Sequence, residues 1–261
     1  MHTRVIPDAA LRPFVLGSSH TARTLATNEV DFFEVLAPES LPVFQLINAG
    51  NSHAFGGLAV PAWVQLDCYS LPTAMIGWAV PQSLVPTDLW QVLLTGVETN
   101  FGVSLDHYDG LVPLSSYTAL PSLEPGTVIG ISLYSLVRGL GLRTKAAALA
   151  RLGARRQIGL TQYGNRAVRT HTALGPLEVL AAQAPPHSLP DETFVYRIEL
   201  DGTYLAALAR GEPPRPPTQP VVHRVPIEPG RTSERIAVLA HRDRITILGV
   251  ENQQLLIGEL C

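Results

Sequence analysis

Runs of apolar residues divide the first half of the chain into predicted strands and one helix. Three runs contain branched or aromatic side chains and are bounded by Gly, Pro or Asn, which is typical of strands. We expect strands of one antiparallel sheet at residues 41–49, 63–68 and 74–80. Residues 87–101 instead repeat apolar side chains at helical spacing, and they predict an amphipathic helix capped by Thr87 or Asp88.

The apolar pattern of the second half changes its period after residue 137. A long run of branched residues predicts a strand, and the alanine- and leucine-rich segment after it favours a helix that ends at Gly153. A shorter helix is expected between Asn165, a favoured N-cap, and Gly175. The predicted order is strand, helix, strand, helix, strand and strand, at residues 126–137, 142–152, 157–162, 166–174, 177–181 and 193–200.

Proline marks the next boundary. Residues 212–220, with the sequence EPPRPPTQP, are typical of a semi-rigid linker. Beyond the linker, short apolar runs predict a three-stranded meander at residues 235–239, 245–250 and 254–260.

Composition limits the partners and the location that we expect. The 261 residues with 46% hydrophobic content suffice for a large core. No apolar run reaches the roughly 18 residues that span a bilayer, and a net charge of −3 gives no reason to expect nucleic acid or a membrane as partner. The first residues do not resemble a signal peptide. We expect a cytoplasmic protein, and the use of arginine in place of lysine indicates a GC-rich, bacterial genome.

Metal chemistry is not expected. Cys68 and Cys261 are the only cysteines, and the histidines are scattered without the spacing of metal ligands. Cys68 follows Asp67 in a predicted strand, where packing is more typical of a cysteine than nucleophilic catalysis.

The most informative element is the junction RGLGLRT at residues 138–144, between a predicted strand and a predicted helix. Glycine allows a backbone to approach an anion closely. A helix N-terminus adds unpaired N–H groups and a partial positive charge of about +0.5. Gly139, Gly141 and the start of the helix can therefore cradle a diphosphate, supplemented by charge-assisted hydrogen bonds from Arg138 and Arg143.

The residues of this junction are also compatible with two other interpretations. An ordinary strand–helix turn also uses glycines and solvated arginines. A dinucleotide-binding unit would place an acidic residue roughly 20 positions after the loop. The next predicted strand, QIGLTQYGN, contains no acid, so the dinucleotide interpretation fails.

The order of elements from residue 126 to 200 resembles the cofactor-binding half of the GNAT acyltransferases. That family has an Arg/Gln-x-x-Gly-x-Gly/Ala loop, which residues 138–143 match except for Arg143 at the last position. It also shows an Asn-x-x-Ala-hydrophobic-x-x-Tyr-x-x-x-Gly-Phe pattern at its last helix. Here His171 replaces the Tyr and Pro176 the Phe, whereas the remaining positions are matched by Asn165, Ala167, Val168, Leu174 and Gly175.

The resemblance implies an α/β (α+β) fold. It has a GNAT-like central mixed, mostly antiparallel, splayed sheet flanked by helices, with a small C-terminal β appendage. The implied domains are an N-terminal extension at 1–37, the acyltransferase domain at 38–211, the linker at 212–220 and the meander at 221–261.

The resemblance also implies an acyl-CoA, acetyl-CoA by default, as co-substrate, with no metal. The pantetheine arm would pair with the end of the long strand and the diphosphate would bind to the amides of the loop. Asn165 would contact the pantetheine or only cap its helix. The implied cofactor-binding residues are Leu136, Val137, Arg138, Gly139, Leu140, Gly141, Leu142, Arg143, Thr144 and Asn165.

The implied reaction is direct attack of an amine, from a small molecule or a peptide, on the thioester. His171 occupies the place of the Tyr that protonates the departing thiolate, and an imidazole can serve as this acid. Its alternative role is packing. No carboxylate lies within residues 126–137, and the candidates for a general base, by residue type only, are Tyr134, Glu124, Asp67 and His53. A homodimer is compatible with the resemblance.

The departures from the family pattern support a second interpretation. Arg143 either points outward to a phosphate or obstructs the loop. If it obstructs the loop, the chain is a catalytically silent GNAT-like module with a binding or structural role.

Overall fold

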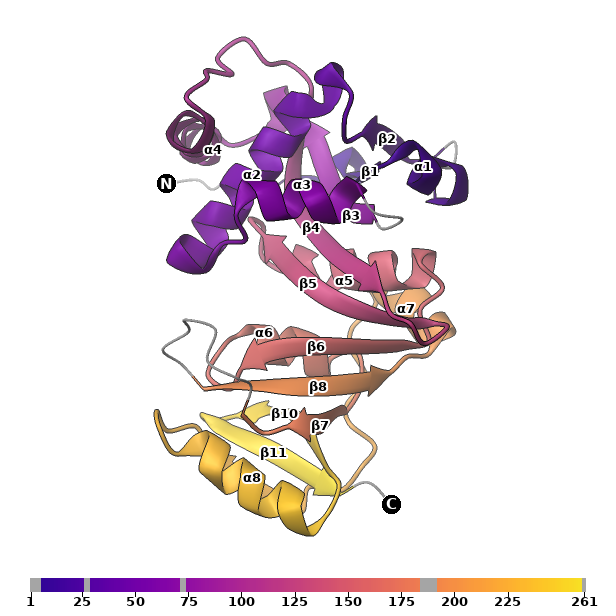
Figure 1. The fold of residues 1–261 in the computed structure, drawn as a ribbon, viewed down its shortest axis with the longest axis vertical. Helices are drawn as coiled ribbons and strands as arrows, with labels where there is room; N and C mark the ends of the chain where they lie inside the picture. Colours follow the sequence, from indigo (N-terminus) through magenta and orange to yellow (C-terminus); the bar gives the residue numbers. More distant parts are fainter. Residues whose placement is uncertain (1–5, 26–28, 71–73, 184–191, 260–261) are drawn as a thin grey trace. The chain divides into compact units, whose positions relative to one another are not determined.

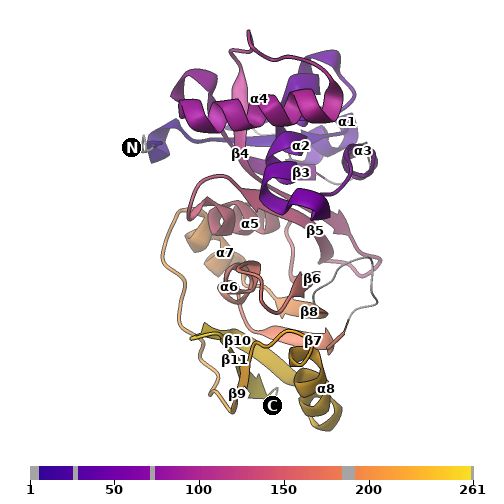
Figure 2. The ribbon, with the colours of Figure 1, turned by 90° about the vertical axis from the view of Figure 1, so that its left-hand side faces the viewer.

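A computed structural model describes residues 6–25, 29–70, 74–183 and 192–259. The chain divides into two compact units, both shown in Figures 1 and 2. Unit 1 comprises Met1–Pro121 and Ile131–Leu152, and unit 2 comprises Ser122–Gly130 and Gly153–Cys261. The predicted domain boundaries stay a prediction.

Unit 1 contains strands in the order β2-β1-β3-β4-β5. β1 pairs in parallel with β2 and antiparallel with β3, which pairs antiparallel with β4. The strands are β1 (Arg12–Gly17), β2 (Asp31–Glu34), β3 (Ala74–Pro81), β4 (Leu111–Pro121) and β5 (Thr127–Ser135), which belongs to unit 1 from Ile131 onward.

Helices cover β4. Both α2 and α5 pack against this strand, and residues 112–119 of β4 are all buried. The helices of unit 1 are α1 (Ser19–Leu25), α2 (Leu41–Phe55), α3 (Ala62–Ser70), α4 (Thr87–Phe101) and α5 (Leu140–Arg151), with short 3-10 turns at Asp8–Ala10, Pro38–Ser40, Gly56–Leu58 and Gln82–Leu84.

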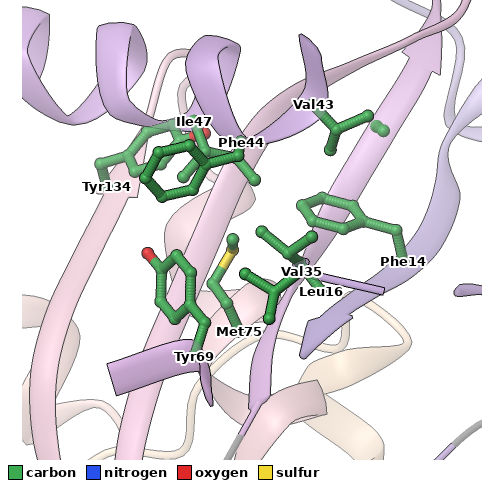
Figure 3. Packing of buried hydrophobic residues seen from close by; sticks show 10 residues of the cluster. Phe14, Leu16, Val35, Val43, Phe44, Ile47, Tyr69, Met75 and Tyr134 are labelled. Carbon is green, nitrogen blue, oxygen red and sulfur yellow. The ribbon is translucent and has the colours of Figure 1, made fainter. Parts of the chain in front are cut away.

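Two apolar clusters form the core of unit 1. Figure 3 shows the first, in which Phe44 of α2 packs edge-on against Tyr69 of α3, with ring centroids 6.1 Å apart. Tyr134 of β5 belongs to the same cluster. The second cluster joins α2 to Trp90, Leu93 and Val97 of α4.

Unit 2 continues with strands in the order β5-β6-β8-β7-β10-β11-β9. β5 pairs in parallel with β6 from Thr127 opposite Arg156 to Ile129 opposite Ile158, and the other strand pairs of the unit are antiparallel. Within it, α6 packs against β10 and α8 against β9. Its further elements are β6 (Arg156–Gln162), α6 (Ala167–Thr172), β7 (Leu177–Ala181), β8 (Thr193–Glu199), α7 (Gly202–Ala209), β9 (His223–Pro226), α8 (Thr232–Arg242), β10 (Ile245–Glu251) and β11 (Gln254–Glu259).

The predicted fold class is confirmed: the chain is mixed α/β, with a large, mostly antiparallel sheet flanked by helices. The predicted order of elements from residue 126 to 200 is also confirmed, as are the strand at β3 and the helix at α4. The cap predicted for α4 at Thr87 or Asp88 is wrong, because the N-cap residue is Pro86 and no side chain caps the helix. Among the described residues, no helix has both the length and the apolar character needed to cross a bilayer.

The strands predicted at residues 41–49 and 63–68 are wrong, because these segments lie in helices α2 and α3. The reason is burial on all sides. Residues 43–51 of α2 are all buried between β4 and α4, so the polar face that would reveal a helical period is absent.

The strand predicted at residues 235–239 is also wrong, because helix α8 covers this segment. The start of α8 is fixed by Glu192, whose carboxylate accepts hydrogen bonds from the amides of Thr232 and Ser233, each at 3.1 Å. A cap so distant in sequence leaves no local signal. The third strand beside β10 and β11 is instead β9.

Candidate functional site

The turn between β5 and α5 in unit 1 is the centre of the predicted site. Leu136 donates its amide to the carbonyl of Leu114 at 2.8 Å, which holds the end of β5 on β4. Gly139 then adopts a left-handed conformation, with φ 84° and ψ −19°, and α5 begins at Leu140. Because a residue with a Cβ is strained in this region, Gly139 permits the sharp entry into the helix.

The start of α5 is open on the side of Gly139. This glycine is exposed, and a Cβ added to it would meet nothing within 4 Å. As the N-cap residue it carries no side chain that could accept the first amides of the helix. A Cβ at Gly141 would lie 3.4 Å from the Cβ of Ser135, which is an ordinary van der Waals contact, so an alanine would also fit at this position. The turn therefore offers backbone donors and a partial positive charge to an anion.

The two arginines of the turn have different surroundings. Arg138 is exposed. The guanidinium of Arg143 lies 3.1 Å from the carboxylate of Asp8 and 5.5 Å from the ring centroid of Trp78. Asp8 and Trp78 therefore hold Arg143 in one position, which leaves Arg138 as the solvated cation nearest Gly139.

Thr144, the last residue of the predicted loop, faces the interior. Its hydroxyl lies 2.8 Å from the hydroxyl of Ser115 and 2.8 Å from the carbonyl of Leu140. Ser115 in turn donates to the carbonyl of Tyr134 at 2.7 Å. This side chain thus ties α5 to β4 and β5, and only its backbone is a candidate for anion binding.

Tyr134, a predicted catalytic residue, is 2% exposed and lies in the cluster of Figure 3. A Cβ added to Gly50 of α2 would lie 2.8 Å from its ring, so the glycine makes room for the tyrosine. Burial raises the pKa of Tyr134 above its usual range. The phenol is therefore protonated at neutral pH.

Asn165 lies in unit 2, where it caps α6. Its side-chain oxygen accepts the amide of Ala167 at 2.8 Å, which confirms the predicted cap. It also lines a pocket of about 300 Å³ together with Tyr163, Glu192 and Glu228. Contact of Asn165 with a pantetheine arm stays a prediction.

His171, the other predicted catalytic residue, also lies in unit 2. It is 7% exposed, and its ring centroid is 5.1 Å from that of Tyr196. The packing role considered for His171 is thus present, and its role as an acid stays a prediction. The structure places Tyr134 and the nine predicted loop residues, 136–144, in unit 1, and Asn165 and His171 in unit 2.

Of the remaining candidates by residue type, His53 is exposed and lines a pocket of about 440 Å³ together with residues of α2 and α4. Hydrogen bonds from Thr127 and Arg156 lower the pKa of Glu124, which is a surface carboxylate. Burial, and then the charge of Asp67, raise the pKa of Cys68, so its thiol is not activated. Within the described part of the chain, no group of three or more His, Cys, Asp or Glu side chains could hold a metal ion.

Sequence reasoning missed a buried row of amides in unit 1. Asn48 of α2 donates to Gln65 at 3.3 Å and accepts from Asn100 at 2.8 Å. One turn further along α2, Asn51 donates to the hydroxyl of Ser132 on β5 at 2.8 Å. The i, i+3 spacing of Asn48 and Asn51 could have revealed this row, but the strand predicted at residues 41–49 concealed it.

The side chain of Asn51 contains one hydrogen-bond acceptor that is not satisfied. Its side chain is 2% exposed, and its carbonyl oxygen accepts no hydrogen bond from any described residue. An unsatisfied buried acceptor costs about 1–3 kcal/mol. Such a group in a folded protein calls for an explanation other than packing.

Comparisons with known proteins give structural neighbours only. No protein-family model matches the sequence, and no curated protein matches it. One solved structure that it resembles is a protein from Desulfovibrio desulfuricans assigned to the GNAT family of acetyltransferases, with 14% identity and a TM-score of 0.39 over 64% of this chain and 96% of that one.

Two further solved structures are similar. One, from Salmonella typhimurium, is assigned as an acetyltransferase and contains acetyl-CoA; the identity is 14% and the TM-score 0.39, over 74% of this chain and 95% of that one. The other, from Acinetobacter baylyi, is also assigned as an acetyltransferase, with 13% identity and a TM-score of 0.36 over 63% of this chain and 88% of that one.

Proposed function

We propose that this chain binds an acyl-CoA, acetyl-CoA by default, and transfers the acyl group to an amine of a small molecule or a peptide. The observation that carries the proposal is the exposed start of α5, where Gly139 leaves the first amides of a 12-residue helix without a side-chain cap. The diphosphate of the donor binds there, with Arg138 beside it. Leu136 and Val137 supply backbone groups to the pantetheine arm, other than the Leu136 amide, which donates to Leu114, and the Val137 carbonyl, which accepts from Leu140 and Ser135.

The reaction needs no covalent intermediate on the protein. The lone pair of the amine attacks the carbonyl carbon of the thioester, a C–N bond forms, and the C–S bond breaks. Its electron pair leaves with the thiolate of CoA. The nitrogen loses one proton and the thiolate takes one up, so the products are an amide and free CoA. The chain accelerates this reaction by holding the two reactants together and by stabilising the charge on the carbonyl oxygen.

A second candidate function is a catalytically silent GNAT-like module with a binding or structural role. The burial of Tyr134 and the packing of His171 on Tyr196 favour it, because the candidate base and the predicted acid are both engaged in packing. This module carries out no acyl transfer.

Thermal unfolding with CoA, acetyl-CoA and longer acyl-CoAs tests the donor site. A ligand at a hundredfold excess over its dissociation constant adds about 2.7 kcal/mol to the stability, so a clear rise in Tm is expected. The absence of any shift at millimolar acyl-CoA would contradict the transferase and favour the silent module. If CoA binds, release of free CoA in the presence of an amine library distinguishes the transferase from the silent module.

A further inference from the structure

Ser132 is the side chain on β5 that is best placed to act on a bound acyl group. It follows Ile131, which is 37% exposed, and precedes Leu133 and the buried Tyr134, and it is itself only partly buried. From residue 132 to residue 136, where the proposed contacts to the pantetheine begin, an extended strand covers roughly 13 Å at about 3.3 Å per residue. A long, extended arm bound along the strand end would carry its thioester toward Ser132.

The hydroxyl of Ser132 is oriented by Asn51. The amide nitrogen of Asn51 donates to the hydroxyl oxygen at 2.8 Å. A hydroxyl has one proton to donate, and the contact with Asn51 uses a lone pair, so the proton stays available. No acceptor among the described residues takes it. Because Asn51 occupies one lone pair of the Ser132 oxygen, the hydroxyl proton can be directed away from Asn51.

Asn51 is held in place by the protein rather than by solvent. It is 2% exposed on a helix that is buried all round, and Asn48, one turn earlier, is fixed by hydrogen bonds with Gln65 and Asn100. Its own carbonyl oxygen has no partner in the described chain. Among the described residues, the Asn51 side chain therefore uses its donor toward Ser132 and leaves its acceptor unsatisfied.

We propose that Ser132 donates a hydrogen bond to the carbonyl oxygen of the thioester and that Asn51 is the residue that positions it. This inference rests on the proposed function and names the group that stabilises the charge. As the amine adds to the carbonyl carbon, the π electrons of the carbonyl move onto its oxygen, and the Ser132 proton is shared with that oxygen without leaving the serine. When the C–S bond breaks, the carbonyl reforms. Ser132 therefore ends the reaction unchanged.

The experiment measures polarisation of the carbonyl directly and needs no knowledge of the acceptor. Acetyl-CoA labelled with ¹³C at the carbonyl is bound to the wild-type chain, and its isotope-edited infrared band is recorded. The same band is recorded for Ser132→Ala, Ser132→Thr and Asn51→Asp. The affinity of each variant for CoA, which lacks the thioester carbonyl, is measured by calorimetry.

The proposal predicts a band at higher wavenumber in Ser132→Ala and in Asn51→Asp. The alanine has no proton, and the aspartate accepts the serine proton and turns it inward. Ser132→Thr should keep the wild-type band. The preference for acetyl-CoA over CoA should fall by about fivefold in Ser132→Ala, which corresponds to one ordinary hydrogen bond. Ser52→Ala, which removes a hydroxyl of α2 that contacts Asn100 at 3.0 Å, is the matched control and should leave the band in place.

The outcomes separate this inference from the proposed function. If the wild-type chain binds acetyl-CoA and Ser132→Ala leaves both the band and the preference unchanged, the role of Ser132 is refuted while the donor site stands. If the wild-type chain binds neither acetyl-CoA nor CoA, the proposed function fails and the inference fails with it. A band that moves equally in Ser52→Ala would show that the shift comes from general disturbance of α2 and would also overturn the proposal.

Discussion

Helices begin in different ways in the two units. In unit 2, α7 is capped by Asp201, whose carboxylate accepts the amides of Thr203 and Tyr204 at 2.8 and 3.2 Å. α8 begins on the carboxylate of Glu192, which takes the amides of Thr232 and Ser233. In unit 1, α2, α4 and α5 all begin without a side-chain cap, and of these three only α5 begins on a glycine, Gly139.

The difference shows what the start of α5 is suited for. A helix N-terminus attracts negative charge, and unit 2 satisfies this with its own carboxylates. The N-terminus of α5 also attracts negative charge, but Gly139, on which the helix begins, is exposed to solvent. An external anion can therefore take the position that Asp201 and Glu192 occupy in their helices, and this comparison supports the diphosphate site.

The strongest way to break the comparison is to give α5 a carboxylate of its own. Gly139→Asp should lower CoA affinity by about 10- to 100-fold, because like charges compete for the same amides. Calorimetric titration measures the effect. Gly139→Asn is the matched control, since asparagine also tolerates the left-handed conformation but carries no charge. Equal affinities for the two variants would refute an electrostatic role for this turn.

The next largest effect concerns a buried lysine of unit 1. Lys145 of α5 is fully buried, and burial lowers its pKa well below the usual value. The unfolded chain, with a lysine pKa of about 10.4, then binds a proton that the folded chain does not, so stability rises with pH below that value. Lys145→Met should be more stable than the wild type at pH 7, by a margin that shrinks by up to about 1.4 kcal/mol per pH unit toward pH 9.

Chemical denaturation of both proteins at pH 7, 8 and 9 checks this expectation. The range ends below the titration of the buried tyrosines, whose raised pKa values act in the opposite direction at higher pH. A stability difference that does not change with pH would show that Lys145 keeps its proton in the folded chain.

Removing an internal cap from unit 2 is the reverse experiment. Glu192→Gln should destabilise the chain by about 1 kcal/mol, because α8 loses the charge at its N-terminus. CoA affinity should not change. Glu212→Gln, which breaks an exposed pair with Arg210 at 2.8 Å, should have little effect on Tm. A larger loss of Tm in Glu212→Gln than in Glu192→Gln would contradict the capping role.

The smallest expected effect separates the two arginines of the turn. Arg138→Gln should weaken CoA binding by about threefold to tenfold and reduce its dependence on salt, as one solvated cation beside the diphosphate is lost. Arg143→Gln should weaken it less, because Asp8 already neutralises Arg143. Titrations at low and high salt compare them. A greater loss in Arg143→Gln would place the anion on the Asp8 side of the turn.

Local signals predicted much of the fold. The change of period after residue 137, the glycines at 139 and 153 and the cap at Asn165 are encoded in neighbouring residues, and each appears in the structure. The failures occur where the tertiary environment decides. α2 looks like a strand because it is buried on every side, and α8 begins on a carboxylate 40 residues earlier in the sequence.

The site was predictable in its backbone but not in its side chains. The turn could be located because glycine is required there by geometry, and Gly139 does adopt a positive φ. The partners of Arg143, and the pairing of Asn51 with Ser132, join residues separated by 135 and 81 positions in the sequence. These contacts form only when the chain has folded, so the local sequence around each residue does not predict them.

The amides at the start of α5 can be observed directly by NMR. The chain is labelled with ¹⁵N-glycine, and CoA is added stepwise while the resonances of Gly139 and Gly141 are followed. We predict large downfield shifts of these two amides that saturate with the calorimetric affinity, and no such shift in Gly139→Asp for the remaining Gly141 amide. If CoA binds while both resonances stay in place, the diphosphate lies elsewhere and the start of α5 is not its site.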